Sequence, residues 1–87
     1  MEYRVEFSKK SMKALFKLPK IVQSNIIKKI ERLATDPYSE YNDVKKLSGE
    51  LDAYRLRAGD YRVIYRILKD DVIIEIIHVA YRREVYR

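Results

Sequence analysis

The segment from Tyr54 to Arg66 constrains this chain most, because it predicts a β-hairpin with an unusual distribution of charge. Two runs of alternating side chains flank Gly59-Asp60, a dipeptide typical of two-residue hairpin turns. With that turn, Arg57 is expected directly opposite Arg62. Residues opposite each other point to the same side of a sheet, and side chains alternate along each strand. The hairpin therefore predicts two dissimilar faces.

One of these faces is expected to carry four arginines, namely Arg55, Arg57, Arg62 and Arg66. The other is expected to pack inward with Tyr54, Leu56, Val63 and Tyr65. Arginines on the wet face of a sheet are common, and acidic neighbours could neutralise them. Like charges directly opposite one another destabilise a sheet, however, and the planar guanidinium group binds phosphate oxygens bidentately. Four arginines on one face of one hairpin therefore favour a binding site for a polyanion.

Composition limits the class of protein. A chain of 87 residues makes a single domain over residues 1–87, and its net charge of +6 indicates an anionic partner. It has no cysteine, which excludes disulfides, thiolate catalysis and cysteine-zinc sites. Its one histidine, His78, is expected to be structural. No apolar run approaches the length of a membrane span. We expect a cytoplasmic protein that uses no metal, no cofactor and no membrane.

The first half of the chain predicts a strand and two helices. Glu2 to Phe7 alternates as a strand does, and Ser8 is a suitable N-cap for a short helix that ends at Pro19. A second helix is expected from about Lys20 to Thr35, followed by a loop from Tyr38 to Asp52. The residues expected to face inward are Met12, Leu15, Phe16 and Leu18 in the first helix and Val22, Ile26, Ile27, Ile30, Leu33 and Ala34 in the second.

A last strand is expected from Val72 to Val79, after a turn around Asp70. A two-residue turn would place Val72, Ile74, Ile76 and His78 on the core face, and Ile73, Glu75 and Ile77 on the arginine face, whereas a three-residue turn would swap these two sets. The expected fold class is thus α+β, in the order β-α-α-β-β-β. A small antiparallel β-sheet would be covered on one face by an N-terminal αα-hairpin.

The C-terminal residues from Tyr81 to Arg87 combine arginine with tyrosine. Guanidinium groups bind phosphates and phenol rings stack on bases, so this pairing is expected for a protein that binds single-stranded RNA. A frayed terminus is the simpler alternative.

The hairpin and the C-terminal residues resemble the RelE/ParE toxin superfamily, and more closely its RelE-like branch. The resemblance is carried by Lys46-Leu47-Ser48-Gly49, by the run from Tyr54 to Tyr65, and by Arg82 to Tyr86. It implies a RelE-like toxin of a type II toxin–antitoxin system that cleaves mRNA on the ribosome, by attack of the RNA 2′-hydroxyl on the adjacent phosphate.

The resemblance also implies roles for individual residues. The catalytic residues would be Arg57, Arg62, Arg82 and Tyr86, and the residues that bind RNA phosphates would be Arg55, Arg66, Arg83 and Tyr81. Arginine stabilises negative charge but is a poor proton donor. Which residue acts as general acid, and which as general base, therefore stays open.

The implied partners are a cognate antitoxin, the ribosome with its RNA, and mRNA. Operator DNA would be bound only through the antitoxin complex. Two alternatives stay open. One is a ParE-like toxin that inhibits gyrase and does not cut RNA, and the other is a non-catalytic module that binds antitoxin and operator.

Overall fold

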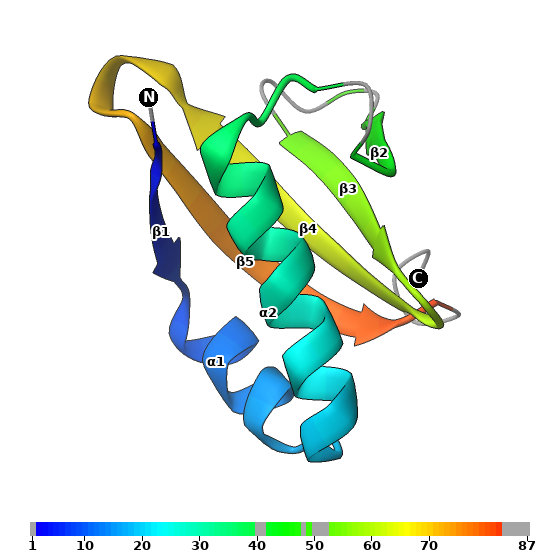
Figure 1. The fold of residues 1–87 in the computed structure, drawn as a ribbon. Helices are drawn as coiled ribbons and strands as arrows, with labels where there is room; N and C mark the ends of the chain where they lie inside the picture. Colours follow the sequence, from blue (N-terminus) through cyan, green and yellow to red (C-terminus); the bar gives the residue numbers. More distant parts are fainter. Residues whose placement is uncertain (1, 40–41, 48, 50–52, 83–87) are drawn as a thin grey trace.

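A computed structural model describes residues 2–39, 42–47, 49 and 53–82. The elements in chain order are β1 (Arg4–Phe7), α1 (Lys9–Phe16), α2 (Lys20–Thr35), β2 (Val44–Lys46), β3 (Ala53–Ala58), β4 (Tyr61–Leu68), the 3₁₀ turn η1 (Lys69–Asp71) and β5 (Ile73–Tyr81). The strands form a single five-stranded sheet in the order β1-β5-β4-β3-β2 (Figure 1).

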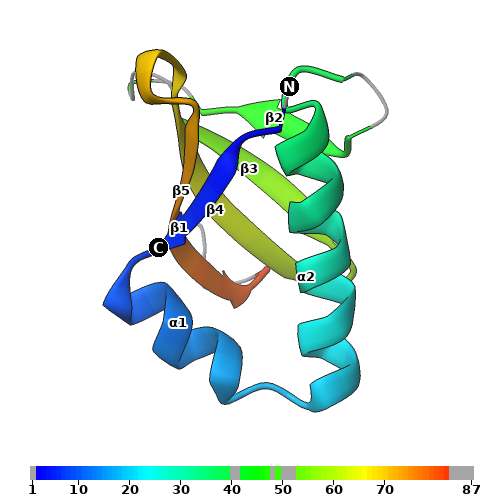
Figure 2. The same ribbon diagram turned by 60° about the vertical axis from the view of Figure 1, so that its left-hand side comes forward.

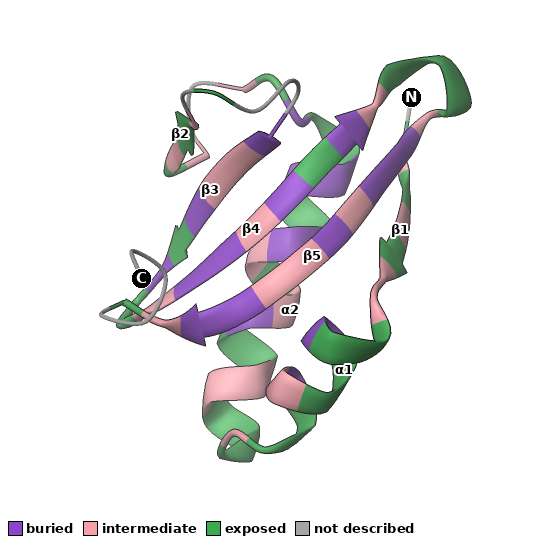
Figure 3. Cartoon of the chain, turned by 180° about the vertical axis from the view of Figure 1, so that it is seen from behind, coloured by how far each residue is buried: buried purple, intermediate pink, exposed green. Residues whose placement is uncertain are grey.

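The two helices lie on the same side of the sheet. Figures 1 and 2 show α2 running across the sheet and α1 packing near β5. Figure 3 shows the opposite face, with α2 behind the strands. The core forms where Ile26, Ile30 and Leu33 of α2 meet Val63 and Tyr65 of β4. The predicted α+β fold with a helical hairpin on one face of the sheet is confirmed. No described helix is both long and apolar enough to span a membrane.

The sheet is mixed, whereas an antiparallel one was expected. β1 pairs with β5 in parallel, with Val5 opposite Ile74 and Phe7 opposite Ile76. Parallel neighbours require a long connection, and the helical hairpin is part of the chain between these two strands. The expected inward side chains of β1, those of Tyr3, Val5 and Phe7, do pack against the core.

A short strand lies where a loop was predicted. β2 pairs antiparallel with β3, so that Val44 is opposite Leu56 and Lys46 opposite Tyr54. The strand has only three residues and lies in a polar stretch, so the sequence gives little indication of it. Its exposed lysines suit an edge strand, because charged side chains discourage further strand pairing.

The arginine hairpin has the predicted register. Tyr54 lies opposite Tyr65, Leu56 opposite Val63 and Arg57 opposite Arg62. Gly59 has φ +61°, and glycine at the first central position suits a two-residue hairpin turn. The expected division between an arginine face and a face packed on the helices is confirmed by the burial of the tyrosine and aliphatic set.

A register shift in β5 overturns one prediction. Tyr65 is opposite Ile76 but Ile64 is opposite His78, which leaves Ile77 as an extra residue. Such a β-bulge turns every later side chain to the other face. Ile74 and Ile76 therefore face the core as expected, but Val79 replaces His78 there, and His78 shares a face with the arginines.

The inward face of α1 also differs from the prediction. Met12 and Phe16 are exposed, and the deepest position belongs to Ser11. The Ser11 hydroxyl lies within hydrogen-bond distance of the carbonyl oxygens of Ile76, at 3.1 Å, and of Ser8, at 2.9 Å. These hydrogen bonds satisfy the buried hydroxyl, so Ser11 can occupy the inward position. The helix is therefore rotated relative to the orientation that Met12 and Phe16 suggest.

Ser8 joins α1 to β5 and offers a test of this packing. Its hydroxyl accepts the Ser11 N–H at 3.0 Å, as the predicted N-cap should, and donates to the Ile77 carbonyl at 3.0 Å. Ser8→Ala should lower the free energy of unfolding by about 2 kcal/mol, from the lost cap and the lost tertiary bond. Urea unfolding measures this change. Ser24→Ala, at an exposed helix position, is the control and should be nearly neutral.

Candidate functional site

The candidate site centres on Arg62, which is unusual for an arginine in being only 8% exposed. Its Nη1 donates to the carbonyl oxygens of Gly59 and Tyr61, both at 3.0 Å. These two bonds tie the guanidinium group to the hairpin turn. Its Nε is buried and has no hydrogen-bond partner in the part of the chain that the structure describes. An arginine of this kind keeps unused donor capacity at a fixed position.

Three further arginines surround Arg62 closely enough to affect its ionisation. Burial lowers the pKa of Arg62, and the positive charges of Arg57, Arg55 and Arg82 lower the pKa further, in that order. Asp43 acts in the opposite direction. Arginine nevertheless stays protonated in proteins, so the cluster is a concentration of positive charge that repels itself. We call Arg55, Arg57, Arg62 and Arg82 the arginine cluster.

Two carboxylates partly balance this cluster. Asp43 lies 4.0 Å from Arg57 Nε, and the Arg57 N–H donates to the Asp43 carbonyl at 2.9 Å. Asp60 lies 3.9 Å from Arg82, and the Arg82 N–H donates to the Asp60 carbonyl at 2.9 Å. Both carboxylates are loosely held at these distances, and the four guanidinium groups outnumber these two carboxylates of the described residues. The positive charge that concentrates here would attract an anionic ligand.

Neither carboxylate was anticipated as a partner of the cluster. Asp43 directly precedes β2, which the sequence did not reveal, so nothing placed Asp43 beside β3. Asp60 was recognised only as a turn residue. The apolar residues Val44 and Leu47 on either side of two lysines are the one signal in this stretch that could have indicated contact with the core.

Arg66 shares the arginine face but lies toward the other end of β4. It is opposite Glu75, which was expected on the arginine face, with 3.9 Å between the charged groups. It is not among the residues that perturb Arg62. Arg66 therefore has its own counter-charge and stands apart from the cluster.

The tyrosines on the helix side of the hairpin belong to the core. Tyr54 and Tyr65 stack with ring centroids 5.5 Å apart. Burial raises the pKa of Tyr65, and its neighbours Tyr54 and Tyr38 reinforce this. Tyr65 thus stays protonated and is no candidate for a general base.

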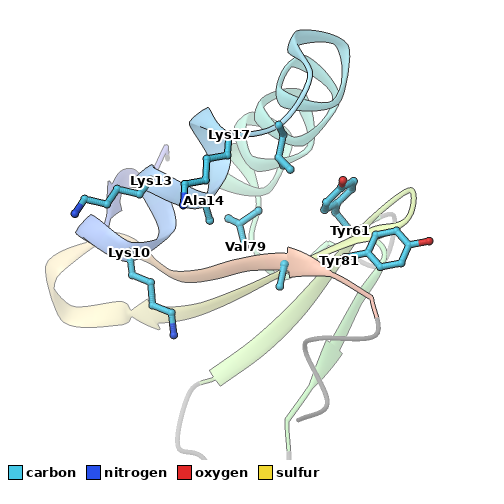
Figure 4. Close-up of a pocket in the computed structure, with 9 residues that line it drawn as sticks. Lys10, Lys13, Ala14, Lys17, Tyr61, Val79 and Tyr81 are labelled. Atoms are coloured by element: carbon cyan, nitrogen blue, oxygen red, sulfur yellow. The ribbon is translucent and has the colours of Figure 1, made fainter.

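Tyr81 is one of the residues that line a hollow on the helix side of the sheet (Figure 4). The hollow has a volume of about 440 Å³, and its lining residues include Lys10, Lys13, Lys17, Tyr61 and Tyr81. The rings of Tyr61 and Tyr81 meet edge to face at 5.5 Å. The Arg82 guanidinium lies 5.9 Å from the Tyr81 ring, so Tyr81 connects the hollow with the arginine cluster. Two further predicted site residues, Arg83 and Tyr86, lie outside the described residues.

Comparisons with known proteins assign the family. Residues 5–86 match the profile of the ParE toxin of type II toxin–antitoxin systems, parDE. A putative RelE1 toxin of Methanocaldococcus jannaschii is 38% identical, over 100% of this chain and 98% of its own. The mRNA interferase toxin RelE of Escherichia coli K12 is 32% identical, over 99% of this chain and 92% of its own.

Solved structures agree. The archaeal RelE–RelB complex from Pyrococcus horikoshii matches with a TM-score of 0.81 and 40% identity, over 94% of this chain and 97% of that one. A mutant of E. coli RelE in the free state also matches with a TM-score of 0.81, at 31% identity, over 99% and 92%. The chain belongs to the RelE/ParE superfamily of type II toxins. Within it, the chain is a member of the RelE family.

The opposition of Arg57 and Arg62 predicts a conflict between stability and activity. Arg57→Gln removes a like-charge pair at the cost of a weak ion pair with Asp43. It should therefore leave the free energy of unfolding unchanged or raise it by up to about 1 kcal/mol, while lowering toxicity. Urea unfolding and growth after induction measure the two effects. A clear loss of stability would mean that Arg57 supports the fold rather than a ligand.

Proposed function

We propose that this toxin is a ribosome-dependent mRNA endoribonuclease that acts in the cytoplasm. The observation that carries the proposal is the buried, fixed Arg62 at the centre of a cluster of arginines. Such an arrangement suits a phosphate that gains negative charge during a reaction. The relatives named as mRNA interferases support the same activity.

In the proposed reaction, the 2′-hydroxyl oxygen of one nucleotide attacks the adjacent phosphorus. The bond from phosphorus to the 5′-oxygen of the next nucleotide breaks, which leaves a 2′,3′-cyclic phosphate and a 5′-hydroxyl. The 2′-hydroxyl loses a proton and the departing oxygen gains one. The proposed reaction needs no cofactor. Arg62, with Arg57 and Arg82, would stabilise the charge on the phosphoryl oxygens.

The remaining predicted site residues would act around this centre. Arg55, Arg66 and Arg83 would bind neighbouring phosphates, and Tyr81 would stack on a base. Tyr86 would take part in proton transfer. The ribosome would position the mRNA and supply what the isolated toxin lacks, so cleavage of free RNA is expected to be slow.

The match to the ParE profile keeps a second function open. In that case the toxin would inhibit gyrase by binding to it and would not cleave RNA. Primer extension on mRNA after induced expression separates the two. Cleavage at fixed positions within codons supports the nuclease, and intact mRNA with DNA damage supports the gyrase inhibitor.

The proposed partner in the cell that makes this toxin is a cognate antitoxin. Related RelE proteins from P. horikoshii, Mycobacterium tuberculosis and E. coli have been solved with RelB or in RelBE toxin–antitoxin complexes. An antitoxin that folds on the positively charged surface would be attracted by the net charge of +6. Operator DNA would be bound by the complex through the antitoxin.

Arg62→Ala tests the proposed activity. It should abolish growth arrest and ribosome-dependent cleavage, because loss of one fixed group that stabilises a transition state costs about 3–4 kcal/mol, a factor of several hundred in rate. Arg66→Ala should cause a smaller loss, and Arg4→Ala, at an exposed residue paired with Glu6, should cause none. Circular dichroism checks that each variant is folded. Full toxicity of a folded Arg62→Ala protein would exclude the assignment.

Tyr86→Phe and Tyr81→Phe test the proton-transfer role. Each change keeps an aromatic ring for stacking and removes only the hydroxyl. Tyr86→Phe should slow single-turnover cleavage on ribosomes more than it weakens ribosome binding, and Tyr81→Phe should have little effect on either. If the Tyr81 change alone is damaging, proton transfer belongs to Tyr81 and not to Tyr86.

A further inference from the structure

Two arginines of the arginine cluster are attached to aspartates in the same way. The Arg57 N–H donates to the Asp43 carbonyl at 2.9 Å, and Arg57 Nε lies 4.0 Å from the Asp43 carboxylate. The Arg82 N–H donates to the Asp60 carbonyl at 2.9 Å, and Arg82 Nη1 lies 3.9 Å from the Asp60 carboxylate. Each aspartate therefore holds the backbone of one arginine and also faces the guanidinium group of the same residue.

Folding alone gives little reason for these two carboxylates. The four side chains of the two pairs are between 48% and 65% exposed. Exposed ion pairs contribute little to stability, and the two separations are longer than a hydrogen bond. The carboxylates also reduce the positive charge that attracts a phosphate. Their place beside the cluster therefore has to serve something other than stability or attraction.

Repulsion within the cluster supplies the reason. Beyond the effect of burial, the charges of Arg57 and Arg82 lower the pKa of Arg62, so both repel it. Arg62 keeps its place through its bonds to the carbonyl oxygens of Gly59 and Tyr61. The exposed side chains of Arg57 and Arg82 would turn away into solvent under this repulsion. A carboxylate beside each one opposes that movement and keeps its guanidinium group near Arg62.

The hairpin turn gathers several of these contacts in three consecutive residues. Gly59 and Tyr61 accept from the Arg62 side chain, and Asp60 between them accepts from the backbone of Arg82. Arg62 belongs to β4, whereas Arg82 directly follows β5. The turn thus fixes two arginines from different parts of the chain relative to each other.

We propose that Asp43 and Asp60 are positioning residues for RNA cleavage, and that they hold Arg57 and Arg82 where the reacting phosphate requires them. This inference rests on the nuclease function proposed above. When a phosphate enters, each guanidinium group exchanges a loosely held carboxylate for phosphate oxygens, after only a small movement. Both aspartates act through an arginine, and neither takes part in proton transfer.

The test uses substitutions that remove only the carboxylate charge. Asp43→Asn and Asp60→Asn keep the backbone carbonyl that accepts from the arginine. Val72 is the only described residue other than glycine with a positive φ, so asparagine at position 60 introduces no backbone strain. Asp70→Asn is the matched control, because it removes an exposed carboxylate from the turn at the other end of β4. Urea midpoints of all three variants should stay close to that of the wild type.

Cleavage is measured on ribosomes programmed with a defined mRNA. Asp43→Asn and Asp60→Asn should each lower the single-turnover rate at saturating toxin about tenfold, because a displaced guanidinium group stabilises the transition state poorly. The toxin concentration at half-saturation should fall about two- to threefold, since each variant has lost a negative charge beside the site. Asp70→Asn should leave the rate unchanged. Asp43→Glu and Asp60→Glu keep the carboxylate and should cleave within about threefold of the wild-type rate.

Combined variants identify the arginine through which each aspartate acts. Asp60→Asn should cost no further rate when Arg82→Gln is already present, and should keep its cost of about tenfold when Arg57→Gln is present. Asp43→Asn should show the reverse pattern. Equal costs in both backgrounds would contradict the assignment of each aspartate to its own arginine.

Two other results would overturn the inference. Tighter binding with an unchanged or faster rate at saturation would mean that the carboxylates only screen the site from RNA. Lower urea midpoints, with a loss of rate that the glutamate variants do not restore, would mean that they only support the fold. Failure of the proposed function has a different signature, because the wild-type toxin itself would then cleave no mRNA on ribosomes, and this inference would fall with it.

Discussion

The opposition of Arg57 and Arg62 across the β3–β4 hairpin is the constraint on which the rest of the structure depends. Two like charges in this position weaken the pairing, so other interactions must hold the register. On the far side of the hairpin, Leu56 and Val63 form a buried cross-strand pair, and the rings of Tyr54 and Tyr65 stack. A slip by one residue would bring the arginines into the core. The core thus fixes the geometry of the arginine face.

The two basic residue types define two surfaces with different chemistry. The arginines of the cluster are held by strands, by a turn and by nearby carboxylates, which suits a ligand that must be placed accurately. The lysines of the helical hairpin are long and flexible, and they suit attraction over a distance and adaptable contacts. The division gives one small domain two positively charged surfaces of different character, one of arginines and one of lysines.

The sequence was sufficient for the arginine hairpin, where a local rule for turns decided the structure. Gly59-Asp60 determined the hairpin and hence which arginines share a face. The sequence was insufficient where long-range contacts decided. Nothing local shows that β1 would pair in parallel with β5. The bulge at Ile77 was hidden because β5 carries aliphatic residues in both phases of its alternation, so neither register stood out. The partners of the cluster were missed for the same reason, since Asp43 reaches Arg57 only through the pairing of β2.

The hydrogen bonds from Arg62 to the carbonyl oxygens of Gly59 and Tyr61 have a consequence for the entropy cost that the proposed phosphate binding would carry. A free arginine side chain has about 2 kcal/mol of rotamer entropy, which is lost when it grips a ligand. In Arg62 that entropy is already lost on folding, so the guanidinium group is preorganised and binding of a phosphate would not reduce its freedom again. The rigidity of the hairpin turn would thereby contribute to the affinity of the proposed site.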